Sequence, residues 1–257
     1  MSLNPPIRDW AHQRIWVIGA STGIGLALAR ALLARGARVA VSARRAGLLE
    51  AEFASAERAL RLPLDITDVA SLEHALEAIV AAWDGLDLGI VMAGTYQPLR
   101  AWELTPETIR GTMETNVYGV MNATALIVRR CLAQGRGHVS IVASVAGYRG
   151  LPKAAVYGPS KAAMINFAET LWLDLASKGI GVSVVNPGFV KTPLTAGNDF
   201  KMPHLMEPED AARAMIAGYE AGEFEIHFPK AFSRQLKLLR QLPHSLYFRA
   251  IKRATGL

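Results

Sequence analysis

The chain has 257 residues, of which 51% are hydrophobic, and this suits one α/β domain with a sizeable core better than two small domains. Its single cysteine, Cys131, excludes an intramolecular disulfide; no run approaches the ~18 apolar residues of a membrane span, and no signal segment is evident, so we expect a cytoplasmic protein. The net charge of +6 comes from residues 226–257, which hold seven Lys or Arg and no acid; the nearly neutral remainder argues against a nucleic-acid-binding domain.

Short β-branched runs alternate with longer segments of helical periodicity along most of the chain. Residues 1–13 are polar, contain two prolines, and are expected to form a loose arm. Strands are then expected at 14–18, 38–42, 60–64, 86–92, 137–143, 181–186 and 224–228, and helices at 26–33, 46–57, 69–83, 106–131, 156–177 and 208–221. Because parallel strands need crossover helices, the alternation predicts one α/β domain over residues 14–230 with a doubly wound parallel sheet.

A glycine-rich turn, Gly19-Ala-Ser-Thr-Gly23-Ile-Gly25, joins the first expected strand to the first helix. Glycine permits a pyrophosphate to approach the backbone N–H groups of a helix N-terminus, where the helix dipole favours an anion. The spacing differs from the commoner Gly-x-Gly-x-x-Gly fingerprint, but its place in a strand–turn–helix unit predicts a dinucleotide site.

The second expected strand ends in Ser42-Ala-Arg44-Arg45, without an acid. A carboxylate there would bind the ribose 2′-hydroxyl of NAD, whereas a guanidinium pairs with the 2′-phosphate of NADP. Arg44, with Ser42 and Arg45 assisting, therefore favours NADP over NAD. A merely solvated turn is the alternative.

Tyr157 and Lys161 are four residues apart and share one face of an expected helix, so the ammonium can lie beside the phenol. A nearby cation stabilises a phenolate and lowers its pKa from about 10, which would make Tyr157 a general acid or base. Taken alone, the pair also suits an ordinary helix. Ser144, thirteen residues earlier, and the glycine turn favour the catalytic reading.

Together these residues resemble the short-chain dehydrogenase/reductase family over about residues 13–228. The matching motifs, in order, are the glycine turn, Asp65, Ala93-Gly94, Asn116, Ser144, Tyr157 with Lys161, and Asn186-Pro187-Gly188. The family's Rossmann-like fold agrees with the sheet that the alternation predicts.

The resemblance implies a catalytic set of Asn116, Ser144, Tyr157 and Lys161. In it Tyr157 exchanges the proton of the substrate oxygen, Ser144 holds that oxygen, Lys161 binds the nicotinamide ribose and lowers the tyrosine pKa, and Asn116 anchors a proton-relaying water. Asp65 matches the acid that receives the adenine amino group, and Thr192 the residue that holds the carboxamide. The implied cofactor-binding residues are Gly19, Ser21, Thr22, Gly23, Ile24, Gly25, Ser42, Arg44, Arg45, Asp65, Ile66, Ala93, Gly94, Tyr157, Lys161, Pro187, Gly188, Val190 and Thr192. No metal is expected.

Three positions depart from the family pattern. Ile18 replaces a usual threonine and Met92 replaces the asparagine of Asn-Ala-Gly, which is expected to loosen the central sheet or alter cofactor affinity. Thr22 occupies a position where many NADP-using relatives carry a basic residue. Arg44 is then the main ligand expected for the 2′-phosphate.

The sequence thus predicts an NADP(H)-dependent oxidoreductase acting on a carbonyl or secondary alcohol. The loops near 93–102 and 145–155 and a lid at about 193–208 are apolar with few charges, which favours a hydrophobic substrate, although the lid's Met and Leu side chains would equally suit core packing. A redox-silent dinucleotide-binding sensor or scaffold and an NAD-dependent epimerase or dehydratase are the alternatives. Relatives are commonly homodimers or homotetramers, so a homo-oligomer is expected.

Residues 231–257 form a basic amphipathic tail. Phe232, Leu236, Leu239 and Leu242 lie along one helical stripe, opposed by basic and polar residues. Such a segment can lie on an anionic membrane, which would place the protein at the inner membrane surface. The alternative is a helix that packs on the domain or on a neighbouring subunit.

Overall fold

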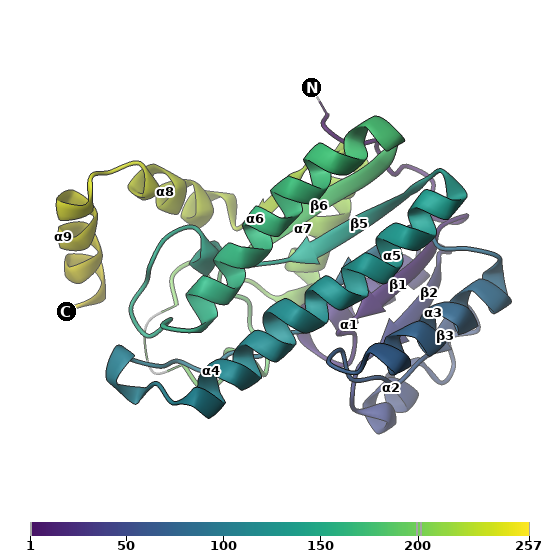
Figure 1. The fold of residues 1–257 in the computed structure, drawn as a ribbon, viewed down its shortest axis with the longest axis horizontal. Helices are drawn as coiled ribbons and strands as arrows, with labels where there is room; N and C mark the ends of the chain where they lie inside the picture. The colour runs from purple at the N-terminus through teal and green to yellow at the C-terminus, as the bar shows by residue number, and fades with distance from the viewer. Residues whose placement is uncertain (1, 199, 201, 257) are drawn as a thin grey trace.

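Seven parallel strands form one sheet in a computed structural model that describes residues 2–198, 200 and 202–256 (Figure 1). They are β1 (Arg14–Ile18), β2 (Arg38–Ser42), β3 (Ala59–Arg61), β4 (Leu88–Val91), β5 (Gly137–Val142), β6 (Ile180–Pro187) and β7 (Glu225–Phe228). Their spatial order is β3-β2-β1-β4-β5-β6-β7. The chain therefore winds outward from β1 in one direction and from β4 in the other, which confirms the predicted doubly wound fold.

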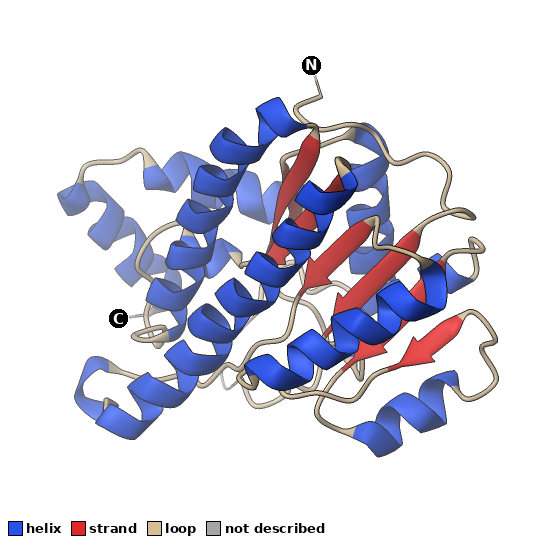
Figure 2. Ribbon diagram, turned by 45° about the vertical axis from the view of Figure 1, so that its right-hand side comes forward, coloured by secondary structure: helices blue, strands red, loops and turns tan. Residues whose placement is uncertain are grey.

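Helices cover both faces of this sheet, and those of one face cross it in Figure 2. They are α1 (Gly23–Leu33), α2 (Ala46–Phe53), α3 (Val69–Trp83), α4 (Pro106–Met113), α5 (Val120–Gln134), α6 (Tyr157–Leu175) and α7 (Pro208–Ala221). Ile15 and Val17 of β1 join the core on one face, with α1 and α7, while Trp16 and Ile18 join the other, with α3, α5 and α6. Because both faces are covered, β1 is an almost continuous apolar run.

The long helix expected over residues 106–131 is interrupted. Between α4 and α5 the chain forms a π-helical turn, Glu114–Gly119, which carries Asn116. A side chain on Gly119 would have its Cβ 2.9 Å from the Ile66 carbonyl oxygen, so the turn lies close against the loop after β3. The helix ends at Gln134, because Gly135 adopts a left-handed conformation with φ +67°.

The N-terminal arm is packed against the domain rather than loose as the sequence suggested. The Asn4 amide donates to the Val182 carbonyl at 2.7 Å and accepts from the Val182 N–H at 3.1 Å. β7 begins to pair with β6 only at Val184, so Asn4 satisfies backbone groups that β7 does not reach. Trp10 is 5% exposed and donates to Glu220 of α7.

The tail folds into two helices, α8 (Lys230–Arg240) and α9 (His244–Thr255), which lie beyond the sheet (Figure 1). The stripe predicted for the first helix faces inward: the Phe232 ring lies 5.6 Å from that of Phe189, and Leu236 and Leu239 are half-buried. In α9, Tyr247 is buried. The tail thus packs on the domain, one of the two arrangements that the sequence left open. No helix in the described part of the chain has the length and apolarity to cross a membrane.

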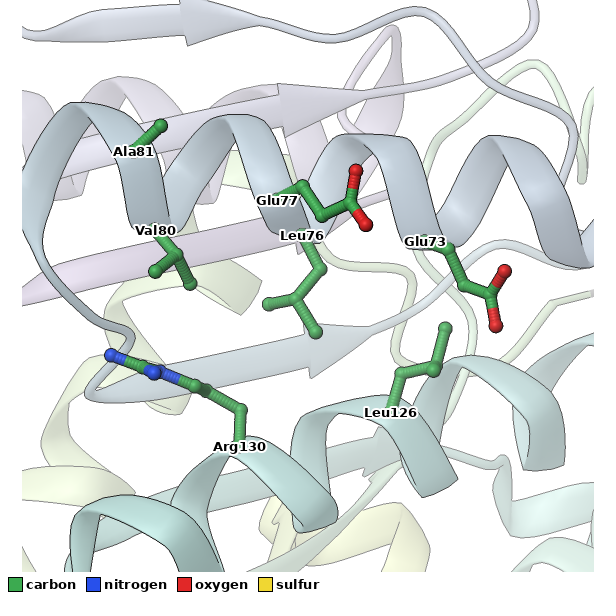
Figure 3. A pocket seen from close by; sticks show the side chains of 7 residues that line it. All are labelled: Glu73, Leu76, Glu77, Val80, Ala81, Leu126 and Arg130. Atoms are coloured by element: carbon green, nitrogen blue, oxygen red, sulfur yellow. The ribbon is translucent and has the colours of Figure 1, made fainter.

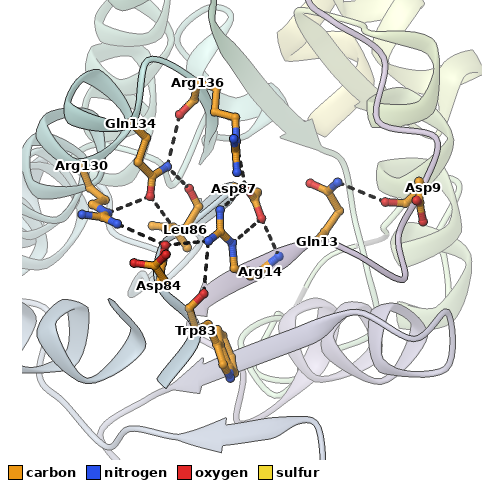
Figure 4. A network of polar contacts seen from close by, with 10 residues as sticks. All are labelled: Asp9, Gln13, Arg14, Trp83, Asp84, Leu86, Asp87, Arg130, Gln134 and Arg136. Carbon is orange, nitrogen blue, oxygen red and sulfur yellow. Dashed lines mark hydrogen bonds and ion pairs between the residues drawn. The ribbon is translucent and has the colours of Figure 1, made fainter. Parts of the chain in front are cut away.

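A half-buried ion pair joins the starts of β1 and β4 (Figure 4). The Arg14 guanidinium donates to both carboxylate oxygens of Asp87 at 2.7 Å, and the two side chains are 13% and 14% exposed. The Asp87 N–H donates to the Arg14 carbonyl, and the His138 N–H donates to the Asp87 carbonyl, both at 2.8 Å. These two bonds connect the starts of β1 and β5 to Asp87. Burial alone would raise the pKa of Asp87, but the hydrogen bonds and charge of Arg14 hold it below 3.8.

Asp87→Asn is expected to lower the free energy of unfolding by about 3 kcal/mol near pH 7, because it leaves the Arg14 charge without its partner. Since the pKa of Asp87 is lower in the folded chain, its contribution is present above pH 3.8 and is lost as the pH falls below that value. Urea unfolding at pH 7 and at pH 3 measures both effects. Asp84→Asn is the control, because Arg14 binds only the backbone carbonyl of Asp84. An equal loss in the two variants would contradict this account.

Candidate active site

A cleft of about 710 Å³ runs along the carboxyl ends of the strands, across the point where the strand order reverses between β1 and β4. In open parallel sheets this point is the usual place for a ligand. All of the predicted site residues line the cleft except Ser42 and Asn116. The lining ones are Gly19, Ser21, Thr22, Gly23, Ile24, Gly25, Arg44, Arg45, Asp65, Ile66, Ala93, Gly94, Ser144, Tyr157, Lys161, Pro187, Gly188, Val190 and Thr192.

A second hollow of about 490 Å³ lies between α3 and α5 (Figure 3). Leu76, Val80 and Leu126 form its apolar part, and Glu73, Glu77 and Arg130 lie around them. It contains none of the residues that the sequence singled out.

The glycine turn leaves no room for side chains. A Cβ on Gly25 would lie 2.1 Å from the Gly19 carbonyl oxygen, and one on Gly23 would lie 2.8 Å from the Thr192 methyl group. Gly19 and Gly23 also have φ of +107° and +58°, which disfavours other residues. Thr22 precedes α1 without a side-chain capping bond, so the helix N-terminus is open to an anion in the cleft.

Two arginines stand at the end of the cleft beside β2. Arg44 and Arg45 are exposed, and the Arg45 guanidinium lies 3.4 Å from the Ser21 hydroxyl of the glycine turn. Asp65 accepts hydrogen bonds from the Thr67 N–H and hydroxyl, which lower its pKa together with the charge of Arg44. Two cations and a hydrogen-bonded carboxylate fit a phosphorylated adenosine.

Ser42 is a correction to the predicted set. Its side chain is fully buried and accepts a hydrogen bond from the Trp16 indole at 2.9 Å. Only its backbone serves the turn, because the Ser42 carbonyl accepts from the N–H groups of Gly19 and Ala20. Ser42 therefore does not bind a ligand through its hydroxyl.

Ser144 and Tyr157 come from the ends of neighbouring elements. Ser144 follows β5 and caps a short 3₁₀ turn, accepting from the Ala146 N–H at 3.1 Å. Its hydroxyl donates to the Pro187 carbonyl at 3.4 Å, so it lies against the end of β6. Tyr157 is the first residue of α6 and lines the same cleft as Ser144, whose hydroxyl acts to lower the pKa of the phenol. The two hydroxyls can thus reach one substrate oxygen.

The electrostatics of Tyr157 and Lys161 differ from the sequence expectation. Burial raises the pKa of Tyr157 to about 12, against the lowering effect of its hydrogen bond with Ser144. The Lys161 Nζ lies 5.7 Å from the Tyr157 ring centre and donates to the Val142 carbonyl at 3.0 Å. Burial lowers the pKa of Lys161 to about 8. The expected depression of the phenol pKa by Lys161 is therefore wrong for this arrangement.

Asn116 stands just outside the cleft and is fully buried. Its side-chain amide accepts from the Thr95 N–H at 2.8 Å and donates to the Thr95 carbonyl at 2.9 Å. It also donates to the Ser160 hydroxyl at 3.2 Å. Asn116 thus ties the loop after β4 to the first turn of α6, which carries Tyr157.

The two apolar departures from the family pattern are accommodated by packing. Ile18 is fully buried and lies in register with Ser42 and Val91, so β1 stays paired with β2 and β4 to its end. The Met92 sulfur would lie 2.8 Å from a Cβ on Gly25, so it fills the space beneath the glycine turn. The strands beside these residues keep their pairing, and an altered cofactor affinity stays a prediction.

Several residues at the site were not singled out by the sequence. Thr95, Thr115, Ala143 and Thr195 also line the cleft. Ala143 directly follows the expected strand 137–143, so the rule that ligands bind at the carboxyl ends of parallel strands was the available signal. Tyr96, in the loop near residues 93–102, lies edge-on to Tyr157 with ring centres 4.8 Å apart.

Known proteins are similar to this chain in sequence and architecture. The short chain dehydrogenase family model matches residues 13–202. An uncharacterized oxidoreductase of Myxococcus xanthus is 36% identical over 249 residues, which cover 95% of this chain and 98% of that one. The 3-oxoacyl-acyl-carrier-protein reductase of Escherichia coli is 34% identical over 181 residues, 70% of this chain and 74% of that one.

Among solved structures, a variant of actinorhodin polyketide ketoreductase with NADPH is similar to this chain with a TM-score of 0.77. It is 27% identical, and the match covers 86% of this chain and 97% of that one.

An unperturbed tyrosine side chain has a pKa near 10 and ionises around that pH. We expect Tyr157 of the free protein to remain protonated there. With a pKa of about 12, only about one tenth of Tyr157 would be ionised at pH 11. The measurement is the tyrosinate absorbance of the wild type minus that of Tyr157→Phe between pH 7 and 11. A difference signal with a midpoint below pH 10 would show that Lys161 does depress this pKa.

Proposed function

The chain belongs to the short-chain dehydrogenase/reductase family, and from this premise we propose that it is an NADP(H)-dependent oxidoreductase that interconverts a carbonyl and a secondary alcohol. The observation that carries the proposal is the convergence of Ser144 and Tyr157 at one end of a cleft whose other parts fit a dinucleotide. The cleft has a glycine cradle that any Cβ would fill and an arginine pair beside it.

A nicotinamide bound at the Pro187–Gly188 end would supply or accept the hydride. Tyr157 gives its proton to the substrate oxygen during reduction and takes it back during oxidation. Ser144 donates a hydrogen bond to the same oxygen and stabilises the negative charge that develops on it. Lys161, one turn along α6, would hold the ribose hydroxyls of the bound cofactor, and its ammonium lies 5.7 Å from the Tyr157 ring centre.

The preference for NADP rests on the end of β2. Arg44 and Arg45 line the cleft where an NAD-binding chain would have an acid, and guanidinium groups pair with phosphate. Arg45 reaches the Ser21 hydroxyl, which keeps it beside the pyrophosphate turn. The similar ketoreductase structure contains NADPH, which supports the same choice.

The preference for a hydrophobic carbonyl substrate rests on the side chains near Tyr157. Tyr96 packs on the Tyr157 ring, and Leu194 lines the cleft. The named relatives are a 3-oxoacyl reductase and a polyketide ketoreductase, both of which reduce ketones.

The two alternative functions account for fewer of these features. A redox-silent sensor would not need both Ser144 and Tyr157 in the lining of the cleft. An epimerase or dehydratase that retains NAD would have no use for an arginine pair at the ribose.

We further propose that the chain assembles into a homodimer or homotetramer through α5 and α6, where Leu132 and Leu173 are 42% and 72% exposed. Light scattering measures this directly.

The outward face of the tail keeps Arg249, Lys252 and Arg253 exposed, so contact with an anionic inner membrane surface also stays a proposal. Vesicle co-sedimentation measures this contact.

Tyr157→Phe should lower kcat for NADPH-dependent ketone reduction by about a hundredfold or more, because the proton donor is lost. NADPH oxidation against a panel of ketones and aldehydes is the measurement. Tyr118→Phe, at a position that is 63% exposed, is the matched control. Equal rates in Tyr157→Phe and wild type would refute the proposed acid.

Arg44→Ala should weaken NADPH binding by about ten- to a hundredfold and leave NADH binding nearly unchanged, because only NADPH carries the 2′-phosphate. Fluorescence titration with both nucleotides measures the two dissociation constants. Arg129→Ala, which removes an exposed arginine from α5, is the control. Identical losses for the two nucleotides would exclude a phosphate role for Arg44.

A further inference from the structure

The two tail helices are bonded to the loop that separates Ser144 from Tyr157. We propose that α8 and α9 form one wall of the substrate site and that Arg149 is the positioning residue that holds this wall in place. The inference rests on the proposed oxidoreductase function. It assigns a role to helices that lie beyond residues 13–202, the part of the chain that the family model matches.

Arg149, in the loop after Ser144, contacts both tail helices. Its guanidinium donates to the carbonyls of Leu239, Arg240 and Leu242 at 3.4, 2.9 and 2.7 Å, and so satisfies the carboxyl end of α8. The same guanidinium lies 4.1 Å from the ring centre of Tyr247 in α9. The Tyr247 hydroxyl donates back to the carbonyl of Gly150 at 2.9 Å.

A second set of bonds joins α8 to the end of β6. Glu225 of β7 accepts from the Tyr148 hydroxyl at 2.6 Å and from the Asn186 amide at 2.9 Å. Its other carboxylate oxygen accepts from Lys237 of α8 at 2.6 Å. Tyr148 adjoins Arg149, and Asn186 precedes Pro187, whose carbonyl accepts from Ser144. One carboxylate therefore connects the tail to both strand ends that carry the catalytic site.

Phe232 of α8 packs against Gly188 at the Pro187–Gly188 end of the cleft. Its Cδ1 would be 3.0 Å from a Cβ on Gly188, which lines the cleft. Its ring packs on Phe189 at 5.6 Å and on His204 at 6.2 Å between centres. Phe189 in turn meets Phe200, so an aromatic surface extends from Gly188 toward the lid.

The chemistry of this wall points to a bulky, uncharged substrate. The Phe232 and Phe189 rings are half-buried and Phe200 is 37% exposed, so apolar ring area remains for a ligand to stack on. The two cations that hold the wall are already bonded, Lys237 to Glu225 and Arg149 to backbone carbonyls. A large hydrophobic ketone would contact the wall, whereas a small ketone would reach Tyr157 without touching it.

The test compares binding of 1-tetralone, a bicyclic ketone, with that of butanone. Calorimetry on the protein loaded with NADP⁺ gives both dissociation constants without turnover, and KM values are measured in parallel. Arg149→Ala should weaken 1-tetralone binding and raise its KM about tenfold, while butanone and NADPH binding change less than about twofold. Arg249→Ala removes an exposed arginine of α9 and should change none of these values.

Lys237→Met is the second variant, in case Arg149→Ala does not fold. It should reproduce the selective loss of 1-tetralone binding, and Lys237→Arg should restore it; Lys252→Met, on the exposed face of α9, is its control. Three outcomes would each overturn the proposed wall. They are unchanged 1-tetralone binding in folded tail variants, equal losses of binding for both ketones, and no 1-tetralone binding by the wild type. Selective binding of 1-tetralone, together with no turnover of any ketone or aldehyde in the panel, would instead refute the oxidoreductase function and leave the wall standing.

Discussion

The parallel pairing of β1 with β4 is the constraint from which the site follows. It joins the two halves of the sheet in register from Ile15 to Ile18, so every strand ends at the same edge. The glycine turn after β1, the loop after β4, Ser144 after β5 and Pro187 at the end of β6 consequently line one cleft. The opposite edge carries the Arg14–Asp87 pair, which fixes where β1, β4 and β5 start and thereby where they end.

The sequence predicted the sheet and most of the cleft because those features depend on local pattern. Strand alternation, glycine spacing and the Tyr157–Lys161 interval are all legible within a few residues. The failures depend on partners distant in the chain. The Ser42 hydroxyl accepts a hydrogen bond from Trp16, twenty-six residues earlier, and the Asn4 amide donates to the Val182 carbonyl. No sequence periodicity reveals either contact. The π-helical turn likewise lies against the loop after β3, and helix propensity does not reveal that contact.

Electrostatics was the least predictable part of the site. Spacing placed Lys161 beside Tyr157 correctly, yet the direction of the phenol pKa depends on burial and on where the ammonium donates its hydrogen bond. With Lys161 bonded to Val142, burial dominates and the proton stays on the phenol. A protonated phenol is the form that a proton donor requires, and the raised pKa also makes this phenol a weaker acid than a free one. The oxidative direction needs additional stabilisation of the phenolate, which the ribose hydroxyls and a cationic nicotinamide would provide when bound.

The tail changes meaning once its partners are known. As a sequence it is a basic amphipathic segment, and its charge suggests an external surface. In the structure its apolar stripe, through Phe232, and two of its polar contacts, through Lys237 and the carbonyls at the end of α8, all face the catalytic end of the domain. Arg149 and Glu225 each bond the tail and a catalytic loop at once, so displacing the helices would also free the chain on either side of Ser144 and Pro187.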